Sequence, residues 1–152
     1  MKINGKSIAV TAILIIVLFF VIMIEIALFI SGPSEKYEAK VQQQISAIQK
    51  DYKDIDNIKR HVFHYIVYIG EDEDTIVWFN EEAKPIVSKE KSSLQLEKAR
   101  QEAKALYGFE DVEVSLGYGY NNPVYVIQSD DCELLLDYDT FKTVYYLDKD
   151  VK

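Results

Sequence analysis

The stretch from His61 to Asn80, HVFHYIVYIGEDEDTIVWFN, brings two histidines close to the carboxylate run Glu71 to Asp74. Imidazole and carboxylate groups ligate metals and act as acid–base pairs in catalysis. Side chains alternate between the faces of a strand, so His61 and His64 point to opposite faces and cannot share one ion. At about 3.3 Å per residue, the carboxylates lie roughly 20 Å or more from His64.

The carboxylate run also lacks the spaced D-x-D-x-D-G pattern of a calcium loop. We therefore interpret the segment as a β-hairpin with a solvated acidic tip and predict no metal site. The sequence contains no G-x-S-x-G, H-E-x-x-H or Gly-rich phosphate motif. We expect no catalytic residues, no cofactor and no enzymatic activity.

The hairpin is apolar on both predicted faces, which one covering helix cannot explain. We expect the second face to pack on a second domain. The alternative is that this face forms a groove for a partner protein. If a partner binds there, the candidate contacts are the large aromatic residues Tyr65, Tyr68, Trp78 and Phe79.

Residues 8–30 are apolar except for Thr11 and Glu25. A bilayer core of about 30 Å needs roughly 20 apolar residues in a helix, so this segment predicts a transmembrane signal anchor. The tail 1–7 carries Lys2 and Lys6, whereas the lysines after the span alternate with glutamates. The positive-inside rule places the tail in the cytoplasm and the rest of the chain outside the cell.

Glu25 lies near the end of this segment, where two interpretations are open. The residues before it are almost long enough to cross by themselves, which would place Glu25 at the outer headgroup boundary. Alternatively, its carboxyl group contacts a polar group on the span of a partner. Glu25 is thus a candidate intramembrane contact.

The chain has a formal net charge of −8 and one cysteine. An acidic exported part offers no electrostatic footprint for nucleic acid, so we exclude nucleic-acid binding. One cysteine forms no intramolecular disulfide, so the hydrophobic core must stabilise the fold. The strand-like pattern around Cys132 indicates a buried thiol.

Two amphipathic helices are predicted. The first begins with Ser34 as its N-cap and carries an apolar stripe from Tyr37 to Ile55. The second begins with the capping box Ser92 and Gln95 and ends at Gly108; its stripe consists of Leu96, Ala99, Ala103 and Leu106.

Strand-like segments follow each helix. After the first helix they cover 59–69, 75–80 and 85–87, and after the second 110–119, 124–129, 132–138 and 143–147. We read this as the order α-β-β-β occurring twice, in domains 34–90 and 91–152. The predicted fold class is α+β: a transmembrane helix, then two small units, each with one helix on an antiparallel sheet.

Two segments carry a resemblance to a known family. Tyr65 to Gly70 followed by Thr75 to Phe79 resembles the paired strands of the TseB (YpmB-like) cell-wall elongation regulators, and the element order agrees. The segment 137–142, DYDTFK, is similar to the D-x-x-T-G-K turn of PepSY domains, with Phe141 in place of the glycine. The preceding strand has Tyr125 where the family often has Trp.

The resemblance implies two cystatin-like, PepSY-related units outside the membrane of a Gram-positive bacterium. It also implies a role in peptidoglycan elongation through contact with a penicillin-binding transpeptidase. The alternative is a PepSY-like inhibitor or chaperone of an exported protease. The family provides no catalytic residues to carry over to this chain.

Overall fold

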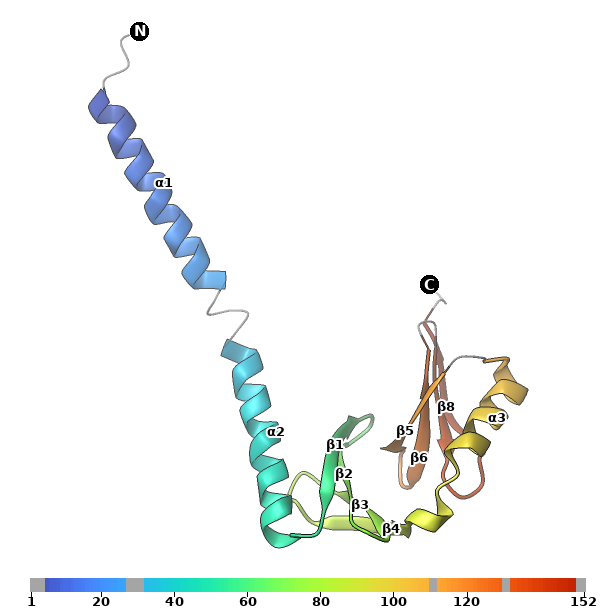
Figure 1. Cartoon of the computed structure of the whole chain (residues 1–152). Helices are drawn as coiled ribbons and strands as arrows, with labels where there is room; N and C mark the ends of the chain where they lie inside the picture. The colour runs from blue at the N-terminus through green and yellow to red at the C-terminus, as the bar shows by residue number, and fades with distance from the viewer. Residues whose placement is uncertain (1–4, 27–31, 110–111, 130–131, 150–152) are drawn as a thin grey trace. The chain divides into compact units, whose positions relative to one another are not determined.

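The computed structural model describes residues 5–26, 32–109, 112–129 and 132–149 (Figure 1). The chain divides into two compact units, residues 1–42 and residues 43–152. The predicted domains 34–90 and 91–152 therefore contribute to a single compact unit over most of their length.

Helix α1 spans Gly5–Ile26. Its segment Ala9–Ile26 is long and apolar enough to cross a membrane, as an anchor or as a signal sequence. Glu25 lies in the last turn of α1, and its side chain is exposed. The predicted tail before Gly5 and the predicted end of the span after Ile26 lie outside the described residues.

Helix α2 spans Gly32–Asp51, so it begins before the predicted N-cap Ser34. Ile48 near its end is fully buried. Just after the helix, the ring of Tyr52 lies 5.1 Å from the ring of Phe79, centroid to centroid. The end of the helical stripe thus packs on the first sheet, as an amphipathic helix is expected to do.

The first sheet is an antiparallel meander of four strands in the order β1-β2-β3-β4. The strands are β1 Asp56–Val62, β2 Ile66–Glu71, β3 Thr75–Phe79 and β4 Pro85–Glu90. The predicted single strand 59–69 was wrong, because the chain reverses between Val62 and Ile66, which pair directly. No Gly, Pro, Asn or Asp marks this reversal, so the sequence carried no turn signal.

The second sheet is built in the same way, in the order β5-β6-β7-β8. Its strands are β5 Glu113–Tyr118, β6 Pro123–Gln128, β7 Cys132–Asp137 and β8 Thr143–Asp148, preceded by the short helix η2 Lys91–Ser93 and by α3 Leu96–Tyr107. In Figure 1, α3 lies alongside this sheet. Each helix is thus followed by four strands: the four segments predicted after the second helix are present, whereas only three were predicted after the first.

The predicted capping box at the start of α3 does not form. Gln95 is the N-cap without a side-chain cap, and its N–H donates to the hydroxyl of Tyr125. Gly108 ends the helix in the left-handed conformation with φ +75°, as predicted. Ala99 and Ala103 are buried, whereas Leu106, predicted to lie on the same stripe, is exposed.

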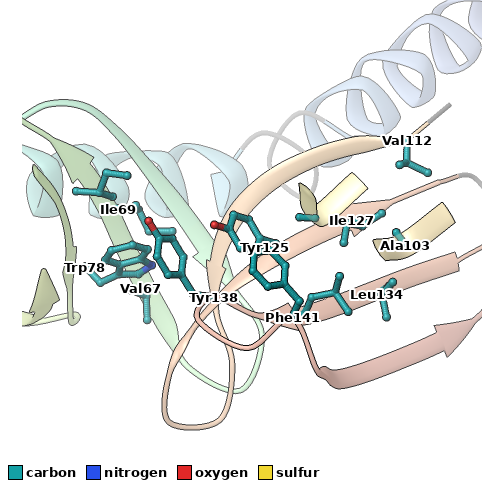
Figure 2. Close-up of a cluster of buried hydrophobic side chains, with 13 residues drawn as sticks. Val67, Ile69, Trp78, Ala103, Val112, Tyr125, Ile127, Leu134, Tyr138 and Phe141 are labelled. Atoms are coloured by element: carbon teal, nitrogen blue, oxygen red, sulfur yellow. The ribbon is translucent and has the colours of Figure 1, made fainter. Parts of the chain in front are cut away.

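One hydrophobic cluster joins the two sheets and α3 (Figure 2). Its largest members are Trp78 from the first sheet and Tyr125, Tyr138 and Phe141 from the second. Tyr125 stacks on Tyr138 at 5.0 Å and on Phe141 at 5.4 Å, and Trp78 meets Tyr138 edge to face at 5.9 Å. The expectation that the second apolar face packs on the second sheet is confirmed. Cys132 is buried on β7, as expected.

Candidate functional site

The acidic tip of the β2–β3 hairpin is held by its own donors. Asp72 Oδ1 accepts the backbone N–H groups of Asp74 and Thr75 at 2.9 and 2.6 Å, and Oδ2 accepts the Thr75 hydroxyl at 2.7 Å. These hydrogen bonds lower the pKa of Asp72, and the one from the Thr75 hydroxyl is the largest cause. Among the described residues no three His, Cys, Asp or Glu side chains gather as a metal site.

The two histidines lie in different surroundings from those predicted, because the chain turns between them. His61 lies on β1, and its Nδ1 accepts the backbone N–H of Tyr118 on β5 at 3.2 Å. Burial lowers the pKa of His61, which favours the neutral imidazole that this bond requires. His61 therefore links the two sheets, whereas His64 is exposed in the β1–β2 turn.

The β1–β2 turn is fixed by aromatic contacts with the second sheet. The Phe63 ring lies 4.9 Å from the Tyr145 ring and 5.2 Å from the Tyr120 ring. Phe63 packs on the buried residues Val124, Val126 and Leu135. Anchoring by Phe63 leaves the next two side chains, His64 and Tyr65, exposed at the surface.

The β3–β4 turn is fixed by one asparagine. Asn80 Oδ1 accepts the backbone N–H groups of Glu82 and Lys84 at 2.9 and 3.0 Å. The Asn80 N–H donates to the Lys84 carbonyl at 2.9 Å, and Ala83 has φ +59°. These bonds determine the orientation of the Asn80 side chain.

Three turns, β1–β2, β3–β4 and β5–β6, meet around a cavity of about 380 Å³, which we call the turn groove. Its lining combines tyrosines, asparagines, glutamates and aliphatic residues, namely Tyr65, Ile66, Val67, Asn80, Glu81, Glu82, Ile86, Tyr118, Tyr120 and Asn121. The side chains of Tyr65 and Tyr120 are 51% and 45% exposed. Such a mixture of aromatic and hydrogen-bonding groups in a concave surface is typical of ligand sites.

A second cavity of about 460 Å³ lies beside β5, and we call it the edge groove. Its apolar lining consists of Ile69, Ile76, Leu94, Leu96, Val114 and Leu116. Lys59, Glu71 and Glu113 contribute charged groups. The Glu71 carboxylate accepts a hydrogen bond from Asn57 Nδ2 at 2.7 Å and pairs with Lys91 at 3.2 Å; the Asn57 bond is the main cause of its lowered pKa.

The first sheet also contacts β5 at the far end of that strand. The indole Nε1–H of Trp78 donates to the Gly117 carbonyl at 2.9 Å, and His61 binds the neighbouring N–H of Tyr118. A Cβ on Gly117 would lie 2.7 Å from His61 Nε2, so only glycine fits this close approach. β5 is the edge strand of its sheet, so no described strand pairs with its outer side.

The four candidate contacts separate clearly. Tyr65 is exposed and lines the turn groove. Tyr68, Trp78 and Phe79 are buried in the unit itself, so they form core rather than surface. The sequence pattern could not separate the four, because aromatic residues on a strand serve both roles. Of the set, only Tyr65 can meet a partner directly in this conformation.

Sequence reasoning missed Tyr120 and Ile86, which line the turn groove together with Tyr65. Tyr120 stands in a short turn that ends at Pro123, a place where an aromatic side chain has little to pack on within its own hairpin. This turn position was the sequence signal that could have indicated a surface role for Tyr120. Which other turn it would meet depends on how the sheets pack.

Comparison of the chain with known protein families, curated proteins and solved structures finds no match.

Proposed function

We propose that the protein is a non-enzymatic, membrane-anchored module that binds another protein outside the cell. An extended strand of that partner would pair with the edge strand β5 beside the edge groove. The observation that carries the proposal is an edge strand, β5, next to an apolar cavity. Val114 and Leu116 are partly buried on the apolar side, and Glu113 and Ser115 are exposed. An extended peptide recognises such an edge by backbone hydrogen bonds and alternating side chains.

The proposal of anchoring rests on α1, whose length and composition suit a single span. An anchor confines the module to the membrane surface, which raises its effective concentration near a membrane-bound partner. In the proposed topology the N-terminus is cytoplasmic, and Glu25 meets either the outer headgroups or a partner's span.

The cellular role and the partner are proposed from the resemblance alone. The hairpin strands and the Asp137 to Lys142 turn resemble the TseB-like regulators, which implies two cystatin-like domains and a role in peptidoglycan elongation. The partner would be a penicillin-binding transpeptidase of a Gram-positive bacterium.

Site-specific crosslinking in cells tests this proposal. A photo-crosslinking residue replaces Ser115 on β5 of the full-length chain, and the matched control replaces Gln101, an exposed residue on α3. We expect a membrane-bound transpeptidase to be captured from position 115 and not from position 101.

The other outcomes discriminate between functions. Capture of an exported protease from position 115 would favour an inhibitor or chaperone. Equal yields from both positions, or no product, would contradict strand addition at the edge groove.

A further inference from the structure

We propose that the turn groove is a binding site for a neutral oligosaccharide. This inference concerns a surface distinct from the edge groove, and it does not rest on the proposed protein partner. The groove brings together Tyr65 from the β1–β2 turn, Tyr118 from the end of β5 and Tyr120 from the β5–β6 turn. Its volume of about 380 Å³ lies in the range of small-molecule sites.

The tyrosines provide the apolar part of sugar recognition. The C–H groups on one face of a pyranose ring are weakly positive, and they pack on the electron-rich face of an aromatic ring. Tyr65 and Tyr120 both expose ring surface in the groove. The His64 ring is near both, with its centroid 4.6 Å from that of the Tyr65 ring and 5.5 Å from that of the Tyr120 ring.

The asparagines and tyrosine hydroxyls provide the polar part. Because Asn80 Oδ1 accepts two backbone N–H groups of its own turn, its side chain is oriented before any ligand arrives. Its Nδ2 amide can then donate to a sugar hydroxyl, and the exposed Asn121 amide offers a donor and an acceptor. The Tyr118 hydroxyl is protonated near neutral pH, so it can donate one hydrogen bond and accept another. Oriented groups bind with less loss of entropy than mobile ones.

The charged groups around the groove bear on the class of glycan. Glu81 and Glu82 line it, Glu82 is paired with Lys84 at 2.7 Å, and no lysine or arginine is among the described lining residues. The lining therefore offers the acid group of a uronic acid, sulfate or phosphate no cation to pair with, so a neutral glycan fits it better. The carboxylates can accept hydrogen bonds from neutral sugar hydroxyls. Exposed Ile86 adds an apolar patch suited to a methyl group such as that of an acetamido substituent.

The groove suits a peptide strand less well than the edge groove does. It is formed mainly by turns, whose backbone donors are used within the turns, as at Asn80 and Ala83. A peptide adding to a sheet needs a run of unpaired backbone groups along a strand. Recognition in the turn groove must therefore come mostly from side chains.

Titration by nuclear magnetic resonance tests the proposal. The full-length, ¹⁵N-labelled chain is placed in phosphocholine micelles, because maltoside detergents carry sugars. The probes are chitohexaose and cellohexaose, with oligogalacturonate as the anionic comparator. We expect saturable amide shifts around Tyr65, Asn80 and Tyr120 with at least one neutral probe, with a Kd on the order of 1 mM. Oligogalacturonate should cause none.

Matched variants show whether the shifts report this groove. Tyr120→Ala should weaken binding about tenfold, as expected when an aromatic contact is lost. The control is Tyr37→Ala on α2, a tyrosine as exposed as Tyr65 at 51%, which should leave the affinity unchanged. Both variants should keep the dispersed spectrum of the folded chain.

Three results would overturn the proposal. They are the absence of saturable shifts with both neutral probes, equal binding of the anionic probe, and binding that Tyr120→Ala leaves unchanged. A protein captured by crosslinking from position 65, together with no shifts from the probes, would assign the groove to a protein instead.

Discussion

Three described non-glycine residues have the positive φ that normally favours glycine: Asn57 at +50° on β1, and Ala83 and Phe141 at +59° each. Ala83 and Phe141 both lie in the turn between the third and fourth strands of a sheet. In the second turn Asp137 Oδ1 accepts the N–H of Thr140 at 2.7 Å, much as Asn80 does in the first. Phe141 thus holds a left-handed backbone conformation that a glycine would adopt at lower steric cost.

Ala83→Gly should stabilise the fold. A non-glycine residue in the left-handed region destabilises the folded state by about 1–2 kcal/mol, and glycine removes this cost. Glycine also gives the unfolded chain more conformational freedom, which offsets part of the stabilisation. We expect a net gain of about 0.5–1 kcal/mol in the free energy of unfolding. Urea titration followed by Trp78 fluorescence measures it. Ala99→Gly, inside α3, should destabilise by about 1 kcal/mol or more; a loss at position 83 would contradict the strain argument.

Phe141 offsets its backbone strain through its ring. The ring stacks on Tyr125, and Lys98 Nζ lies 4.2 Å from its centroid. Phe141→Ala removes these contacts and keeps the strain, with an expected loss of about 2–4 kcal/mol. Phe141→Gly relieves the strain, so we expect it to be more stable than the alanine variant in the same titration. The reverse order would show that φ at this position relaxes.

His61 should make stability depend on pH. Burial lowers its pKa in the folded state, so below the ordinary value of about 6.5 the unfolded chain binds the extra proton more readily. Its contribution is present above about pH 6.5 and is lost as the pH falls towards the lowered pKa. Urea midpoints at about pH 7.5 and 5.5 should differ less in His61→Gln than in the wild type. His64→Gln, in the exposed turn, serves as the control and should keep the wild-type difference.

At the scale of elements, the approach of β1 to β5 depends on Gly117. An added methyl group would meet Val126 and His61, so Gly117→Ala should destabilise by about 1–3 kcal/mol. Gly119→Ala is the milder control, since its nearest neighbour, Val124 Cγ1, would lie 3.0 Å from the new Cβ. Equal urea midpoints for the two variants would mean that β5 can move away from β1.

The ends of a helix also differ in how far contacts with distant parts of the chain determine where they lie. Gly108 ends α3 by its own backbone preference, whereas the start of α3 depends on the Tyr125 hydroxyl from a distant strand. Lys89 Nζ pairs with Asp139 at 2.8 Å between β4 and the β7–β8 turn, but this exposed pair contributes at most about 1 kcal/mol. In the core, the sheets are connected by the edge-to-face contact of Trp78 with Tyr138 and by the Trp78 hydrogen bond to the Gly117 carbonyl.

At the scale of the whole molecule, the shared core predicts cooperative unfolding of residues 43–152. Trp78, the one tryptophan of the chain, is fully buried and donates a hydrogen bond to β5. We expect Trp78 fluorescence and far-ultraviolet circular dichroism to report the same urea midpoint in the full-length chain. Separate midpoints would show that the two sheets unfold as independent domains.

Local sequence patterns account for the features that are encoded by neighbouring residues. The apolar run that forms α1, the stop at Gly108, the β2–β3 hairpin and the antiparallel strands of the second sheet follow from periodicity, length and turn residues. The α+β class follows from the order of these elements. Each is encoded within a few residues of where it appears.

Only the tertiary structure decided which aromatic residues are core and which form a surface. The turn at Phe63 has no glycine or proline, and the partly buried Phe63 ring holds it by packing on the second sheet. That turn moves Tyr65 to the surface beside Tyr120, while Trp78 is buried against Tyr138. The physical reason is that burial depends on contacts between residues far apart in the chain, which no local pattern specifies.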